Sequence, residues 1–351
     1  MAQNTYLAGD LGGTKTLLSV YGERNGLLQP LVTQRYLSGE WGCLEDMLQH
    51  FLQEVPSELP QPVTSCIAVA GPVKNGTAKL TNLPWTMSEE ALGSATGLQR
   101  LELVNDFAVL IHGLPHFDQR QQVSLQGQKP GPLASGPVAI LGAGTGLGMA
   151  RGIPDAGGWV ALSSEGGHRE FAPRTDDEWH LANWLKADLD LDRLSIERIV
   201  SGTGLGHVMR WRLQRGDAAG HPLRQAADAW RTKPVDAEGY QDLPAQVGQA
   251  AQNGDAVARN ALDLWLGAYG SAAGDLALQE LCTGGLWIGG GTAAKQLKGL
   301  QSATFLEPLR RKGRFRPFLE GLSVQAVIDP NAGLFSAACR ARDLTTAIAA
   351  S

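Results

Sequence analysis

The sequence lacks an excess of positive charge, a long apolar run and any close pair of cysteines. Its formal net charge is -5, so there is no basic field to attract a nucleic-acid backbone, and we expect no nucleic-acid partner. No stretch approaches the ~18 consecutive apolar residues of a membrane span, and no signal-length apolar run precedes Asp10. We therefore expect a cytoplasmic protein with no membrane partner.

The four cysteines are Cys43, Cys66, Cys282 and Cys339, and they form no CxxC or Cys/His cluster. This spacing indicates neither a zinc knuckle nor a disulfide scaffold, so we expect buried thiols. The chain has 351 residues, of which 43% are hydrophobic and 19% are charged. Such a chain is long enough for two domains and should fold throughout.

Glycine-rich turns follow apolar strands at three places in the chain. Residues 5–9 lead into Asp10-Leu-Gly-Gly-Thr14, and residues 138–141 lead into Gly142-Ala-Gly-Thr-Gly-Leu-Gly148. Each of these two turns is followed by a second apolar segment, so we expect the same kind of β-hairpin at both places. The third cluster, residues 284–291, is a buried strand and a turn before a helix at 292–300. Such turns let backbone N–H groups approach a phosphate.

Each turn also has a simpler explanation. Gly-Gly beside Asp10 is common turn chemistry. The second cluster contains the spacing of a dinucleotide fingerprint, but Met149-Ala-Arg151 does not begin a convincing helix, so that interpretation is weak. Three such turns together favour a nucleotide site, because glycine inside a strand or turn has an entropic cost.

The rest of the chain shows an α/β pattern followed by a more helical part. In the first part we expect a helix at 44–52 and strands at 66–71 and 101–104. In the second part we expect helices at 179–186, 196–200, 208–213 and 255–278, and strands at 285–288 and 324–328. Residues 214–245 are polar and rich in Gly and Pro. This composition predicts a surface segment between helices with no catalytic or binding role.

Polar residues follow two of the expected strands. Asn105 and Asp106 stand at a strand end, where α/β proteins gather their ligands, although both residues also suit a helix N-cap. Glu165 and His168 flank two glycines in a loop that can aim both side chains at sugar hydroxyls. Taken alone they could be solvated, and Glu197 could be an exposed helix residue.

The three glycine turns resemble the two phosphate motifs and the adenosine motif of the actin, sugar kinase and Hsp70 superfamily. The sites around Asn105, Glu165 and Glu197 are similar, in this order, to the pattern of bacterial glucokinases. Further matches are Leu80-Thr-Asn-Leu-Pro-Trp85 and Asn331-Ala-Gly-Leu-Phe-Ser-Ala337. The related repressor/kinase group carries a cysteine-rich zinc motif after its sugar-binding histidine, and residues 169–173 contain none, so that zinc-dependent branch is disfavoured.

This resemblance implies an α/β fold of the two-lobed, actin-like ATPase (ribonuclease H-like) type, with a smaller and a larger domain around a cleft. The small domain is expected to comprise residues 1–112 plus 331–351, and the large domain residues 113–330. The implied activity is that of a glucokinase of glycolysis, which transfers the γ-phosphoryl of ATP to the 6-hydroxyl of D-glucose, giving glucose 6-phosphate and ADP.

The resemblance also assigns roles to individual residues. Asp106 is the expected catalytic base, and Asp10 is expected to hold Mg²⁺ through water. The expected sugar-binding residues are Asn82, Asn105, Asp106, Glu165, His168 and Glu197. The expected ATP-binding residues are Asp10, Gly12, Gly13, Thr14, Lys15, Gly142, Gly144, Thr145, Gly146, Gly289, Gly290 and Gly291. Lys15 departs from some bacterial members, which have a smaller polar residue there, and its role stays open.

Two alternative functions remain at this point: a kinase for another hexose, and a non-catalytic sugar sensor on the same fold. The acidic balance disfavours a DNA-binding regulator. A polyhydroxyl substrate is favoured over a carboxylate by the candidate residues Asn105, Asp106, Glu165 and His168. A carboxylate substrate would be bound by Arg or Lys. Three points stay open: whether polyphosphate can be the phosphoryl donor, how strictly glucose is selected over other hexoses, and the oligomeric state. A homodimer is one option.

Overall fold

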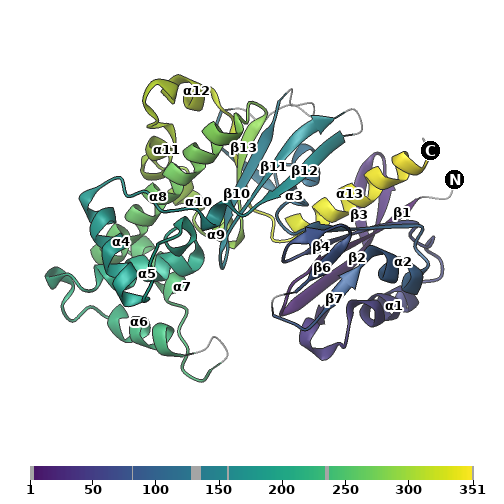
Figure 1. Cartoon of the computed structure of the whole chain (residues 1–351), viewed down its shortest axis with the longest axis horizontal. Helices are drawn as coiled ribbons and strands as arrows, with labels where there is room; N and C mark the ends of the chain where they lie inside the picture. The colour runs from purple at the N-terminus through teal and green to yellow at the C-terminus, as the bar shows by residue number, and fades with distance from the viewer. Residues whose placement is uncertain (1–3, 81, 128–135, 156–157, 234–236, 350–351) are drawn as a thin grey trace.

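The computed structural model describes residues 4–80, 82–127, 136–155, 158–233 and 237–349. Its α/β architecture has two main sheets, each with its own layer of helices, joined by two helices between them (Figure 1). None of the helices in these ranges combines the length and apolarity that crossing a membrane requires.

The first main sheet has five strands. Their order is β3 (Leu27–Leu37), β2 (Lys15–Arg24), β1 (Thr5–Leu11), β4 (Thr64–Val69) and β8 (Arg100–Asn105). Every residue of β4 is buried, as expected for a central strand that is covered on both faces. Helices α1 (Leu44–Glu54) and α2 (Glu89–Thr96) belong to this part, with a small sheet of β5 (Val73–Lys74), β6 (Thr77–Lys79) and β7 (Thr86–Ser88).

The second main sheet has six strands. Their order is β12 (Gly158–Ser164), β11 (Leu147–Asp155), β10 (Val138–Ala143), β13 (Gly285–Gly289), β14 (Val324–Val327) and β9 (Gln122–Gln126). Strand β10 pairs antiparallel with β11 and parallel with β13, just as β1 pairs antiparallel with β2 and parallel with β4. The expected glycine-tipped hairpin is therefore present twice, in equivalent places of the two sheets.

The second part of the chain carries most of the helices, which gather at the end of the molecule far from the first sheet (Figure 1). They are α4 (Asp176–Asp188), α5 (Gly202–Arg212), α6 (Leu223–Thr232), α7 (Leu243–Gln252), α8 (Ala256–Glu280), α9 (Gly291–Lys295), α10 (Leu297–Leu300), α11 (Ala303–Arg310) and α12 (Arg316–Gly321).

Two sequence-based expectations for this part need correction. The helix expected at 196–200 is only a 3-10 turn, Ile196–Arg198. Residues 214–245 are not merely a surface excursion, because they contain α6 and the start of α7, and Ala226 and Ala227 of α6 are buried in the core. The small apolar face of α6 is hidden in the sequence by its many polar neighbours.

Helices α3 (Leu110–Gly113) and α13 (Ala332–Ala349) pack against each other between the two sheets. The contact is close, because a Cβ added at Gly113 would lie 2.0 Å from Ser336 Oγ. One buried apolar cluster joins residues of both sheets through these helices, and a separate cluster fills each lobe. The strands of the two sheets fall on either side of the expected domain boundaries, which stay a prediction.

Candidate active site

A cavity of about 520 Å³ lies where the ends of strands from both sheets meet. Its lining comes from the ends of β4 and β8, the β10–β11 hairpin, the segment after β12 and the turn at Glu197. The polar and glycine residues of that lining are Gly71, Asn105, Asp106, Gly142, Gly144, Thr145, Gly146, Gly148, Ser163, Ser164, Glu165, His168 and Glu197. Most of the residues expected to bind the sugar therefore line one cavity.

Asp106 follows β8 and is oriented by its neighbour Asn105. Asn105 Oδ1 accepts hydrogen bonds from the backbone N–H groups of Phe107 and Ala108, at 3.0 and 3.1 Å. Asn105 Nδ2 donates to Gly71 O at 3.1 Å and to Asp106 Oδ1 at 3.0 Å. Neither residue is the N-cap of α3, which is Val109; Asn105 fixes the turn after β8, and the carboxyl group of Asp106 lies in the cavity lining.

The carboxyl group of Asp106 has a strongly perturbed pKa. Burial raises this pKa to about 6, and the negative charge of Asp10 adds to the effect, against the lowering influence of local hydrogen bonds. A carboxylate with a pKa close to neutrality is a better proton acceptor than an ordinary aspartate and is still ionised at pH 7.

Glu165, His168 and Glu197 converge although the chain brings them from two different segments. His168 Nε2 lies 3.7 Å from Glu165 Oε2, and His168 Nδ1 lies 4.0 Å from Glu197 Oε1. The side chains of Glu165 and His168 are 79% and 56% exposed, while that of Glu197 is 26% exposed. The cavity wall therefore offers both donors and acceptors to a ligand with several hydroxyl groups.

Glu197 also contacts the glycine-rich β10–β11 loop. Its Oε2 accepts a hydrogen bond from Leu147 N at 2.9 Å. The next residues add to this contact: Gly202 N donates to Gly144 O at 2.8 Å, and Thr203 Oγ1 donates to Thr145 O at 3.0 Å. The loop therefore has a fixed shape that is set by the segment 197–203.

The sequence predicted no role for two threonines, Thr203 and Thr292, that hold this loop. Thr292 Oγ1 donates to Ala143 O at 2.8 Å, so it holds the β10–β11 loop from the side of β13. Their only sequence signal is a threonine beside glycines, a common pattern that does not reveal its partner.

Phe107 explains two of the glycines in that loop. Gly142 and Gly148 face each other across the β10–β11 pair. A Cβ added at Gly142 would lie 2.4 Å from the ring of Phe107, and one at Gly148 would lie 2.1 Å from it. These two glycines make room for the residue after Asp106, whereas a Cβ at Gly144 would meet nothing within 4 Å.

The third glycine cluster lies directly against the second. Gly289 pairs with Gly142 in parallel register. Gly290 has a φ of +81°, and a Cβ there would lie 2.5 Å from Ala143 O. Gly291 follows as the first residue of α9 and has open space around it. Two of the three expected nucleotide motifs thus form one continuous backbone surface.

The first glycine turn, at the tip of the β1–β2 hairpin, is held from behind by Ser38. Gly12 N donates to Lys15 O at 3.0 Å, Ser38 Oγ donates to Gly12 O at 2.7 Å, and Ser38 N donates to Thr14 O at 3.1 Å. A Cβ at Gly13 would lie 2.9 Å from Asn82 Cβ, so Asn82 sits at this turn. The residues of this turn and Asn82 are not part of the cavity lining described above.

Asp10 lies near the start of α13, because a Cβ at Gly333 would be 3.2 Å from Asp10 Oδ2. Burial raises the pKa of Asp10, and the charge of Lys15 opposes this. Within the described ranges, no three or more His, Cys, Asp or Glu side chains are grouped so that they could hold a metal ion by themselves.

Comparison with known sequences identifies the family. The sequence model of the family described as Glucokinase matches residues 7–344. The chain belongs to the glucokinase family. A glucokinase of Nostoc sp. (strain PCC 7120) is 39% identical over 341 residues, which cover 96% of this chain and 98% of that protein. A glucokinase of Synechocystis sp. (strain PCC 6803) is 38% identical, with 95% and 96% of the two chains covered.

A solved structure agrees with this assignment. The crystal structure of a glucokinase from an Antarctic psychrotroph has a TM-score of 0.80 and 29% sequence identity, and the match covers 97% of this chain and 99% of that one. The glucokinase family, the actin-like α/β fold and the function of an ATP-dependent glucokinase, all predicted from the sequence, are confirmed.

Proposed function

We propose that Asp106 is the base of the glucokinase reaction and that the 520 Å³ cavity binds the sugar. The observation that carries this proposal is the pKa of Asp106, raised to about 6 in a cavity shared with Glu165, His168 and Glu197. The carboxylate accepts the proton of the 6-hydroxyl of glucose while that oxygen attacks the γ-phosphoryl of ATP, and ADP leaves.

The sugar is held by hydrogen bonds from the cavity wall. Glu165, His168 and Glu197 supply acceptors and a donor for its hydroxyl groups, so that the 6-hydroxyl is fixed beside Asp106. Asn105 acts chiefly on Asp106, because its amide already donates to Asp106 Oδ1 and Gly71 O. Asn82 sits at the first glycine turn, and we propose that it lies between the sugar and the phosphates.

The phosphates of ATP are proposed to lie against the backbone of the two hairpin loops and of residues 289–291. The positions Gly144 and Gly291 have open space where a side chain would be, which lets a ligand approach the backbone there. The same surface is rigid, because it is held by hydrogen bonds from Glu197, Thr203, Thr292 and Ser38. A rigid cradle aligns the γ-phosphoryl without reorganisation in the transition state.

The residues present fit a Mg²⁺ ion. Asp10 and Asp106 are close enough that the charge of Asp10 raises the pKa of Asp106, and burial raises the pKa of Asp10 as well. A cation would offset this concentration of negative charge. Mg²⁺ usually binds through one or two carboxylates, waters and substrate phosphates, so Asp10 would hold it through water. When bound, the ion neutralises charge on the phosphates.

A coupled assay tests this function. The wild-type protein should phosphorylate glucose with ATP and Mg²⁺, and a panel of hexoses, with polyphosphate compared as the donor, measures its stringency. Asp106→Ala should lower kcat by at least ~10²-fold while glucose binding stays measurable. Asp192→Asn, an exposed aspartate, is the control. Retention of more than about a tenth of wild-type kcat by Asp106→Ala would reject Asp106 as the base.

The cytoplasmic location, the place in glycolysis, the domain boundaries and the homodimer stay predictions.

A further inference from the structure

A second and larger cavity, of about 810 Å³, lies away from the proposed active site. Its walls are the β2–β3 hairpin, one face of α13, and the two segments that lead from one main sheet to the other, at residues 115–121 and 329–331. A volume of this size is within the range of small-molecule sites. None of the lining residues belongs to the catalytic or nucleotide motifs described above.

Helix α13 presents a row of side chains to this cavity. Phe335, Cys339 and Arg342 lie on one face, at positions i, i+4 and i+7. Two helical turns separate Phe335 from Arg342, which corresponds to ~10 Å along the axis at 1.5 Å per residue. An aromatic ring and a guanidinium group are thus held at a fixed separation on a rigid element.

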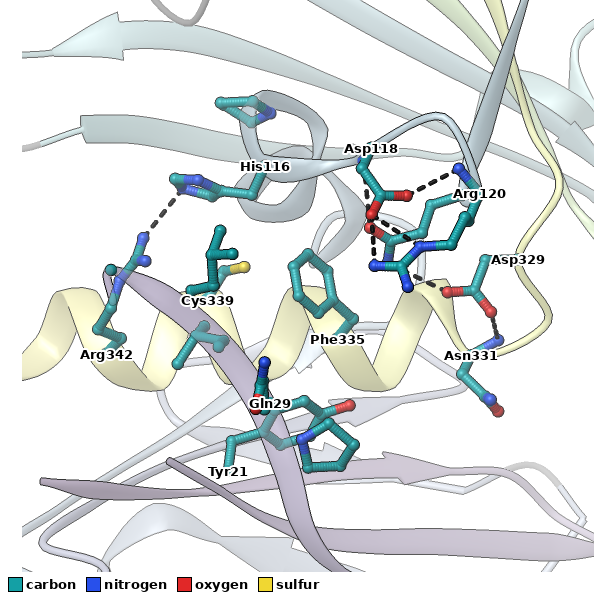
Figure 2. Close-up of a pocket in the computed structure, with 16 residues that line it drawn as sticks. Tyr21, Gln29, His116, Asp118, Arg120, Asp329, Asn331, Phe335, Cys339 and Arg342 are labelled. Atoms are coloured by element: carbon teal, nitrogen blue, oxygen red, sulfur yellow. Dashed lines mark hydrogen bonds and ion pairs between the residues drawn. The ribbon is translucent and has the colours of Figure 1, made fainter. Parts of the chain in front are cut away.

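The ring of Phe335 is partly buried and is fixed by other aromatic side chains. Its centroid lies 5.9 Å from that of Phe117 and 6.5 Å from that of Tyr21. Figure 2 shows the ring in the middle of the cavity, between the pair His116–Arg342 at one end and the pair Asp118–Arg120 at the other. Such a ring offers a platform on which a flat heteroaromatic group can stack.

The end of the cavity near Arg342 is suited to an anion. Arg342 Nη2 donates to His116 Nε2 at 3.0 Å and lies 3.4 Å from Asp343 Oδ1 (Figure 2). The side chain of Arg342 is only 20% exposed. Arg342 pairs with Asp343, which does not line the cavity, and its partner in the cavity is the imidazole of His116. A guanidinium in this position, largely shielded from water, can bind a phosphate by charge-assisted hydrogen bonds.

The other end of the cavity is polar: Asp118 is paired with Arg120, whereas Asp329 accepts hydrogen bonds from uncharged groups. Arg120 is bound to Asp118, with its Nε and Nη2 at 3.0 and 2.7 Å from Asp118 Oδ2. Asp329 accepts hydrogen bonds from Gln121 Nε2 at 3.1 Å and from Asn331 N at 2.9 Å (Figure 2). This end therefore offers hydrogen-bonding groups, and the carboxylate of Asp329 is an acceptor suited to the amino edge of a base or the hydroxyls of a ribose.

We propose that this cavity is a second ligand site and that it binds a nucleoside monophosphate. The phosphate lies at Arg342 and His116, and the base stacks at Phe335 about 10 Å away, a span that a mononucleotide covers. A sugar phosphate has no flat aromatic group for Phe335, and free phosphate leaves most of the cavity unused. The site is distinct from the proposed ATP site, which lies on the glycine-rich loops.

Calorimetric titration of AMP into the glucose-bound full-length protein tests the site. The wild-type protein should bind AMP in this cavity, in addition to any AMP held at the catalytic nucleotide site. Arg342→Gln should weaken this binding by about 10- to 100-fold, the effect of losing a charged hydrogen-bonding partner, and should leave any binding at the catalytic site unchanged. Turnover of glucose should be the same in both proteins, which separates this site from the proposed catalytic one.

A second set of measurements guards against a simple folding defect. His116 lies on a different element from Arg342, and His116→Ala should lower the AMP affinity of the same site. Arg314→Gln, a substitution on the distant surface, should leave that affinity unchanged. Adenosine, ribose 5-phosphate and inorganic phosphate should each bind this site at least tenfold more weakly than AMP. AMP binding that neither Arg342→Gln nor His116→Ala weakens relative to the wild type, or phosphate binding as tightly as AMP, would overturn the proposal.

Discussion

Glu197 Oε2 accepts a hydrogen bond from the backbone N–H of Leu147 at 2.9 Å. The same carboxyl group has its other oxygen 4.0 Å from His168 Nδ1. One side chain therefore touches both the proposed sugar site and the glycine-rich loop proposed to bind phosphate. This arrangement places one carboxyl group between the two proposed substrate sites, whereas the sequence assigned it only to the sugar.

Glu197→Ala should raise the KM for both glucose and ATP. The substitution removes a sugar contact and leaves Leu147 N–H without its acceptor, a loss of about 1 to 3 kcal/mol. Glu197→Gln keeps an oxygen for Leu147, so it should restore most of the ATP KM while glucose binding stays impaired. Steady-state kinetics with each substrate varied in turn makes the comparison, and a normal ATP KM in Glu197→Ala would contradict the link.

Glu165 and His168 should act on glucose alone. Both lie in the cavity wall, and no hydrogen bond from either side chain to the described part of the glycine-rich loops is present. Glu165→Gln or His168→Ala should therefore raise the glucose KM strongly, lower kcat somewhat and leave the ATP KM nearly unchanged at saturating glucose. If both variants kept a near-normal glucose KM, this segment would be only a solvated turn.

Activity should fall at acidic pH because the base must be ionised. With the pKa of Asp106 at about 6, kcat/KM for glucose should be near its plateau at pH 7 and should drop about tenfold per unit below pH 6. Asp10→Asn removes a negative neighbour that raises this pKa, so the acid limb should move to lower pH, whatever happens to the absolute rate. A limb that stayed in place would show that the two carboxyl groups do not interact.

Two glycines of the β10–β11 loop should respond differently to alanine. In Gly148→Ala the new Cβ would lie 2.1 Å from the Phe107 ring, so the core must shift, at a cost of about 1 to 3 kcal/mol in the free energy of unfolding. Gly144→Ala meets no atom within 4 Å and should leave stability unchanged, but it should weaken ATP by blocking close approach. Thermal unfolding and ATP KM measured on both variants provide the test, and equal stability of the two would reject the packing role of Phe107.

The sequence by itself determined the glycine-tipped hairpins, the position of Asp106 at a strand end and the glucokinase family. These features are local: a turn needs its glycines within a few residues, and a strand end is visible from the apolar run before it. The family followed because several such local motifs occur in one order along the chain.

The tertiary structure alone decided which residues touch. Glu197 meets Leu147, Phe107 fills the space over Gly148, and Phe335 and Arg342 face a cavity that they share with His116. Each of these contacts joins segments that are far apart in the sequence. Glu197 meets Leu147 within the second lobe, whereas the other contacts exist because α3 and α13 pack between the two sheets and fix how the lobes meet. Burial and shape in both places depend on many side chains at once. No short stretch of sequence carries that information, so these partners could not be read from it.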